Sequence, residues 1–171
     1  ETAARFKAGL ENAIPEVLRD LLKAYVVVRF GGDELLPLFV KLLYAEHGEV
    51  RQAAVEAMRH LGIDRVSGAV KDLAVLLADP VPSVRSAGCE ALAWLGADAA
   101  QAVPALVDCV HGDDELDIQV SAARGLTIID PNGVELAKVT DHTKRDALIE
   151  GLRQLDHVGR ALRRLLPPLW T

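Results

Sequence analysis

Apolar and polar residues alternate along most of the chain with the period of an α-helix. Residues 83–96, SVRSAGCEALAWLG, have apolar or small side chains at positions i, i+3, i+4, i+7, i+8 and i+11. This spacing places them on one stripe of a helix that faces a core. An Asp-Pro turn signal precedes the stretch and Gly96 closes it, as expected for the two ends of a helix. The stripe comprises Val84, Ala87, Gly88, Ala91, Leu92 and Leu95.

The same pattern occurs three times at a fixed spacing. EVRQAAVEAMRHLG (49–62) aligns with residues 83–96 at an offset of 34, and DIQVSAARGLTIID (117–130) lies 34 further on. A shorter apolar helix precedes each copy, at 36–43, 70–77 and 103–110. The second step between these shorter helices is 33, so the turn HGDDELD must supply the missing residue. Each unit is therefore a helix A, a turn and a helix B.

Such hairpins cannot bury their apolar faces alone, so copies must stack into a quasi-one-dimensional array. We predict a single all-α domain, an α-solenoid, with repeats at 34–62, 66–96 and 98–130. Residues 1–32 are expected to form an N-terminal helical cap or degenerate repeat, with Pro15 near a helix start and Gly31-Gly32 as its stop. Residues 131–171 are expected to form a C-terminal helical cap. Because the chain opens on Glu1, we expect an excised domain, a processed chain or part of a longer one.

The repeated pattern D-P-x-x-x-V-R-x-A-x-x-x-A-L-x-x-L-G resembles HEAT repeats, particularly the bacterial type found in phycobilisome lyases and scaffold proteins. The resemblance implies a right-handed superhelix of helical hairpins. It also implies a ladder of contacts between neighbouring repeats, with Asp79, Arg51 and Arg85 in the ladder positions. The sequence departs from the pattern at Ala45, where Asp is expected, and at Gln119, where Arg is expected. We therefore expect a short ladder and a less tightly coupled third repeat.

Charge is distributed unevenly along the chain. The formal net charge is −6, which opposes nonspecific binding to phosphate backbones. Residues 1–140 hold 13 basic and 21 acidic side chains, whereas 141–171 hold 6 and 4. Nucleic acid is thus disfavoured as a partner. Arg160, Arg163 and Arg164 form a basic edge that fits either phosphate contact or the solvated face of a capping helix.

The composition also bounds the compartment. No apolar run approaches the roughly 18 residues that span a bilayer, and no signal peptide is visible, so we expect no membrane association. Cys89 and Cys109 are too few for a disulfide framework, and we predict two free, partly buried thiols in a cytoplasmic protein. Cys89 occupies a small-apolar slot of the repeat, which indicates packing rather than nucleophilic chemistry.

No catalytic or metal-binding motif emerges, so we predict neither enzyme activity, nor a cofactor, nor a metal. The five histidines are isolated, and only one His/Glu pair is adjacent, in the reverse of the order used by the HEAT-repeat enzyme deoxyhypusine hydroxylase. The acidic turn HGDDELD lacks the alternate spacing and central Gly of an EF-hand loop. Acidic residues before a helix B are favourable at the positive end of its dipole without any ion.

The outward face of the B helices is the predicted binding surface. It is mixed in sign and partly apolar, which suits a protein partner or a neighbouring domain better than phosphate. Trp94 fits both a packing role and a binding role. The alternatives are nucleic-acid binding through the C-terminal basic edge, an accessory role for a bound chromophore, suggested only by the resemblance to phycobilisome lyases, and self-association of exposed repeat ends. The candidate binding residues are Glu56, Arg59, His60, Glu90, Trp94 and Arg124.

Overall fold

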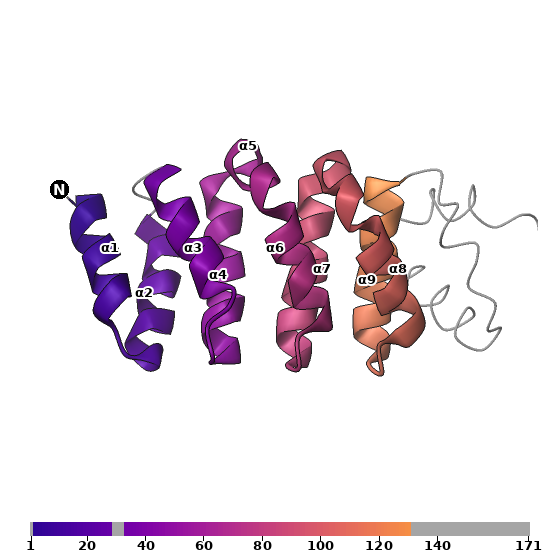
Figure 1. Ribbon diagram of the computed structural model, residues 1–171, viewed down its shortest axis with the longest axis horizontal. Coiled ribbons are helices and arrows are strands. Elements are labelled where there is room, and N and C mark those ends of the chain that lie inside the picture. Colours follow the sequence, from indigo (N-terminus) through magenta and orange to yellow (C-terminus); the bar gives the residue numbers. More distant parts are fainter. Residues whose placement is uncertain (1, 29–32, 131–171) are drawn as a thin grey trace, which may run out of the picture.

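The computed structural model describes residues 2–28 and 33–130, and these form a stack of antiparallel helices with no strand among them (Figure 1). Short 3-10 turns at Asp33–Leu35, Ser67–Ala69, Leu76–Ala78 and Gly96–Ala102 lead into or extend several helices. The α-helices are α1 (Thr2–Asn12), α2 (Pro15–Val28), α3 (Leu36–Leu42), α4 (Gly48–Leu61), α5 (Ile63–Val66), α6 (Val70–Val75), α7 (Pro82–Leu95), α8 (Val103–Gly112) and α9 (Leu116–Ile129).

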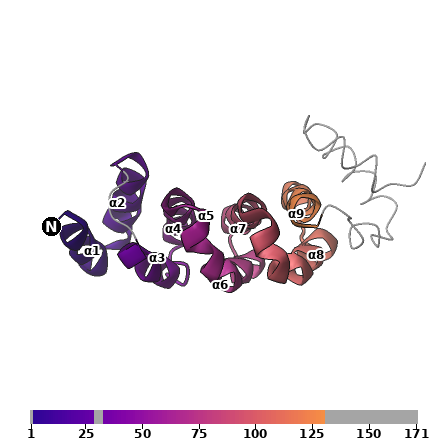
Figure 2. The same cartoon turned by 90° about the horizontal axis from the view of Figure 1, so that it is seen from above.

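The helices lie in two rows. Figure 2 shows α1, α3, α6 and α8 in one row and α2, α4, α7 and α9 in the other, which lies on the inner side of a shallow curve. The three predicted B helices are α4, α7 and α9, and their starts are 34 residues apart in both steps. The predicted all-α architecture of stacked helical hairpins is confirmed.

The 33-residue step between helices A is absorbed at the end of α8. Helix α6 and its following 3-10 turn end at Ala78, whereas α8 continues through His111 to Gly112. The extra residue of HGDDELD therefore lengthens helix A, and the turn before helix B keeps its register.

Two glycines end B helices in a conformation that other residues rarely adopt. Gly62 follows α4 with φ of 101°, and Gly96 follows α7 with φ of 60°. A Cβ atom disfavours positive φ, so glycine at these positions stops the helix at little cost. The sequence-based prediction of a glycine stop is confirmed in both repeats.

The core is built from aliphatic and small side chains between the two rows. Val84, Ala91, Leu92 and Leu95 of the predicted stripe are buried, and Ala87 is half-buried. At the N-terminal end an aromatic cluster joins three helices, because the ring of Tyr25 stacks on Phe6 at 5.6 Å and meets Phe39 edge-on at 5.1 Å.

The buried arc of each B helix is wider than the sequence pattern indicates. Val55, Cys89, Ala123 and Thr127 were assigned to the outward face, and all four are buried. The reason is geometric: a helix in the middle of a row packs against its own helix A and against a B helix on each side. Packing, rather than exposure, is thus the role of Cys89.

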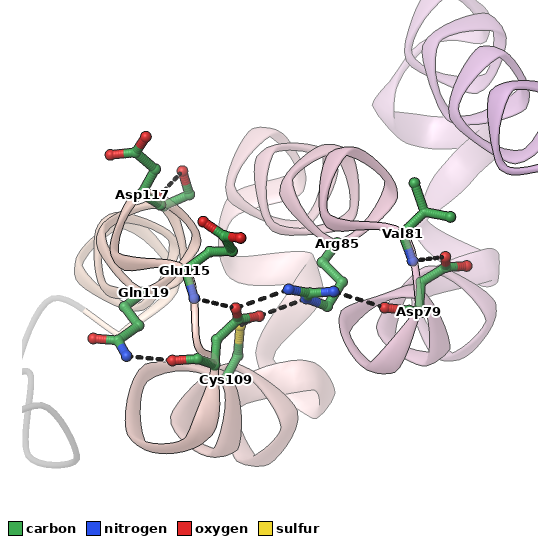
Figure 3. Close-up of polar contacts among 9 residues, drawn as sticks. Asp79, Val81, Arg85, Cys109, Glu115, Asp117 and Gln119 are labelled. Atoms are coloured by element: carbon green, nitrogen blue, oxygen red, sulfur yellow. Dashed lines mark hydrogen bonds and ion pairs between the residues drawn. The ribbon is translucent and has the colours of Figure 1, made fainter.

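An arginine-aspartate ladder joins successive repeats along one edge of the stack. Arg51 donates to both carboxylate oxygens of Asp79, at 2.6 and 2.7 Å, and to the carbonyl oxygens of Ala45 and Glu46. Arg85 repeats the arrangement 34 residues later: it donates to Asp113 at 2.6 and 2.9 Å and to the carbonyl oxygen of Asp79 at 3.0 Å (Figure 3). Such bidentate pairs with extra hydrogen bonds offset the desolvation of the buried charges.

Each aspartate of the ladder also shapes its own turn. Asp79 accepts the backbone N–H of Val81 at 2.8 Å, and Asp113 accepts that of Glu115 at 2.9 Å. Both are Asx turns that lead into a B helix. One carboxylate therefore fixes a turn and holds the arginine of the preceding repeat.

Gln119 stands where a third arginine would be. Its amide nitrogen donates to the carbonyl oxygen of Asp113, as the arginines do six residues back, while its buried Oε1 has no partner among the described residues (Figure 3). The short ladder is thus confirmed. The expectation of a less tightly coupled third repeat is wrong, because the coupling of the third repeat to the second depends on Arg85 and Asp113. Each arginine reaches forward along the chain, so the glutamine at position 119 leaves that junction intact.

Candidate functional site

Two adjacent cavities open along the row formed by α2, α4, α7 and α9. The first has a volume of about 610 Å³ and is lined by side chains of α2, α4 and α7. The second has a volume of about 280 Å³ and is lined by α4, α7 and α9. Both are bounded by Arg59 and Glu90, so they form one surface feature, here called the B-face groove.

The first cavity is lined mainly by charged and small polar side chains. Arg19 Nη1 on α2 contacts Glu49 Oε2 on α4 at 2.6 Å. Arg59 Nη1 on α4 lies 3.4 Å from Glu56 Oε2 and 3.7 Å from Glu90 Oε2 on α7. These ion pairs bridge neighbouring B helices. The further polar and small residues of this cavity include Lys23, Gln52, Ser83, Ser86 and Ala87.

The second cavity is more apolar. Trp94 is half-buried against the core and still lines the cavity, beside Ala93. Ile128 of α9 forms the opposite wall and is 39% exposed. The remaining lining residues are Ser121 and Arg124 together with the shared Arg59 and Glu90. Trp94 therefore packs and remains available to a ligand, which accommodates both of its predicted roles.

Five of the six candidate residues meet in the groove. Glu56 and Arg59 line the first cavity, Trp94 and Arg124 line the second, and Glu90 lines both. His60 lines neither cavity: its Nε2 lies 3.3 Å from Glu56 Oε1, where it buttresses that carboxylate. The alternative site at Arg160, Arg163 and Arg164 lies outside the described residues.

Sequence reasoning missed the contribution of α2. Arg19 and Lys23 lie one helical turn apart and line the first cavity. The N-terminal segment was not aligned with the repeats, although extending the period by 33 residues upstream from α4 pairs Arg19 with Gln52 and Lys23 with Glu56. That alignment would have placed both cations on the face of the B helices.

The cysteines and the acidic turn have structural roles in the part of the chain that the structure describes. Both thiols are free and buried, as predicted. A hydrogen bond with Cys109, together with burial, raises the pKa of the Cys89 thiol well above its usual range, which disfavours the thiolate. In the acidic turn, Asp113 belongs to the ladder, and no group of His, Cys, Asp or Glu among the described residues could hold a metal ion.

A sequence profile for HEAT repeats matches residues 36–127, which is more than half of the chain. The chain belongs to the HEAT-repeat family. The matched region spans α3 to α9, which contain both rungs of the ladder and most of the groove, and leaves α2 with its Arg19 and Lys23 outside. The family resemblance drawn from the repeated pattern is thereby confirmed.

Solved structures support the same fold. One engineered protein is 21% identical, with a TM-score of 0.60 over 90% of this chain and 79% of its own. A second engineered protein is 23% identical, with a TM-score of 0.61 over 94% of this chain and 46% of its own. At this identity the similarity establishes the helical-repeat fold alone. No curated protein matches the chain. Within residues 2–28 and 33–130, no helix is long and apolar enough to cross a membrane.

Proposed function

We propose that this HEAT-repeat chain is a non-catalytic protein-interaction module that receives a partner protein, or a neighbouring domain, in the B-face groove. The observation that carries the proposal is the continuity of the groove. Two cavities that share Arg59 and Glu90 run across four parallel helices, so a ligand can contact all of them at once. HEAT repeats generally mediate protein–protein interactions, in agreement with this assignment.

The groove has the composition of a protein-binding surface. It combines a tryptophan and an exposed isoleucine with a polar rim, and tryptophan and arginine are the residue types that most often dominate binding energy. The helices that carry these side chains are held in register by the ladder on Arg51 and Arg85. A preorganised surface loses little conformational entropy when a partner binds, which favours affinity.

The experiment compares partner capture by two matched variants. Arg59→Ala/Trp94→Ala removes a cation and an aromatic ring from the groove, whereas Lys41→Ala/Tyr44→Ala removes the same two types from the exposed part of α3 and the turn after it. The wild type and both variants are immobilised, bound proteins are identified by mass spectrometry, and the Kd of a purified partner is then measured.

We expect the groove variant to weaken the Kd at least tenfold and the α3 variant to change it less than twofold, since truncation of a central hot spot costs roughly 2 kcal/mol or more. Circular dichroism verifies that both variants remain folded. Equal affinity of the two variants for every captured partner would place the binding surface elsewhere.

A further inference from the structure

The charged side chains of the groove differ in how far they reach into solvent. The side chains of Glu49, Glu56 and Glu90 are 72%, 50% and 53% exposed. The side chains of Arg19 and Arg59 are only 30% and 34% exposed. The arginines lie along the helices while the glutamates extend past them, so an approaching ligand meets carboxylate oxygens first.

The hydrogen-bonding capacity of the groove is also unequal. Arg19 already donates to Asp20 and to Glu49, and Arg59 is shared between Glu56 and Glu90. A carboxylate has about four acceptor positions, so each exposed glutamate keeps room for further donors. Charge-assisted donors, namely Lys or Arg, are the groups that best complement such a surface.

An apolar cavity lies directly beside these carboxylates. Glu90 borders the second cavity, whose walls include Trp94 and Ile128. A cavity of about 280 Å³ accommodates a large apolar side chain. A cationic residue at Glu56 and Glu90 would therefore place an adjacent apolar residue against Trp94. Lys23 at the α2 end is exposed and repels a cation there, which favours the α4–α7 part of the groove for the basic residue.

We propose that the B-face groove binds a basic segment of a partner protein in which Lys or Arg stands next to a large apolar side chain. This inference rests on the proposed function and specifies the chemistry of the partner. Glu56 and Glu90 receive the cation, and Trp94 with Ile128 receives the apolar side chain. The Arg59 ion pairs yield to the incoming cation readily, because exposed ion pairs contribute little in water.

The test is a selection of peptides from a random nine-residue phage library on the full 171-residue chain. The selected peptides are synthesised with a fluorophore and titrated by fluorescence anisotropy against the wild type, Glu56→Gln/Glu90→Gln and the control Glu34→Gln/Glu46→Gln, whose glutamates are exposed outside the groove. We expect enrichment of Lys or Arg beside Leu, Phe or Trp. We also expect about fivefold weaker binding to the groove variant, with no change in the control.

Added salt and Trp94→Ala probe the two parts of the groove separately. Salt should weaken the basic peptides further, whereas Trp94→Ala should weaken them even at high salt. Acidic or neutral selected peptides that still require Trp94 would overturn the basic-segment inference and leave the proposed function standing. Peptides that bind equally well to the groove-filling variant Ser86→Trp, or no selected peptides at all, would count against both proposals.

Discussion

The Arg85–Asp113 pair shows how one residue connects two repeats. Burial alone would raise the pKa of Asp113, but the hydrogen bonds from Arg85 and from the Glu115 N–H outweigh it and hold that pKa below its usual value. The same pairing raises the pKa of Arg85. The carboxylate is therefore the form on which the turn and the repeat junction depend.

This linkage predicts a pH-dependent cost of Asp113→Asn. A depressed folded-state pKa means that the stabilisation is complete above the unfolded pKa, near 3.9, and is lost as the pH falls through the folded value. We expect Asp113→Asn to destabilise the protein by about 2 kcal/mol at pH 7. The difference from wild type should shrink below about pH 4, as measured by thermal unfolding from pH 7 to pH 2.5.

The neighbouring Asp114 provides the control, because it is exposed and lies outside the ladder. Asp114→Asn should change the unfolding temperature little at any pH. A constant stability difference between Asp113→Asn and wild type across the whole range would contradict the role of the ionised carboxylate.

The sequence predicted the ladder only in part. Arg51, Arg85 and Asp79 followed from the family resemblance, and their contacts are the expected ones. Asp113 was hidden because an acidic turn with one extra residue offers four carboxylates and no local signal for which one meets an arginine 28 residues earlier. Only the packing of α8 against α6 and α7 selects it.

Close packing between helices depends on a small residue at one position of α7. A Cβ atom added at Gly88 would lie 3.1 Å from Leu77 Cδ1 and 3.2 Å from Leu76 Cβ. At Gly125 of α9, the corresponding atom would lie 3.6 Å from Leu106 Cδ2, which is ordinary contact. The two glycines therefore have different reasons to be small, although both lie in helix interiors.

The comparison predicts opposite effects of the same substitution. Replacing glycine with alanine inside a helix gains about 1 kcal/mol of helix propensity. Gly125→Ala should keep that gain, whereas Gly88→Ala should fall about 1–2 kcal/mol below it because Leu76 Cβ cannot rotate away. Urea unfolding of both variants measures the difference, and equal stabilities would mean that α7 has room to shift from the 3-10 turn after α6.

The groove was predicted at the level of elements more successfully than at the level of its edges. The helical period located α4, α7 and α9, and from them Glu56, Glu90 and Trp94. The period cannot reveal how much of each helix the neighbouring B helices cover, so Val55 and Ala123 were placed on the wrong surface. Exposure in a repeat array is a property of the stack, not of a single amphipathic helix.

At the scale of the whole molecule, stability is expected to vary along the stack. Helices α4 and α7 have B-row neighbours on both sides, whereas α1 lies at the end (Figure 2). The described contacts that anchor α1 are the buried Leu10 and the stacking of Phe6 on Tyr25. In a nearest-neighbour array, an end unit opens without its interior neighbours.

We therefore expect amide hydrogen exchange to be fastest in α1 and slowest in α4 and α7, as measured by mass spectrometry on the full chain. Deleting residues 2–12 should expose Tyr25 and speed exchange in α2, while the protection of α7 stays within about twofold of wild type, because α2 and α4 lie between the deleted helix and α7. Uniform protection from α1 to α7, or loss of α7 protection after the deletion, would show instead that the stack opens as one cooperative unit. In that case a ligand in the B-face groove would stabilise every helix equally rather than α2, α4, α7 and α9 first.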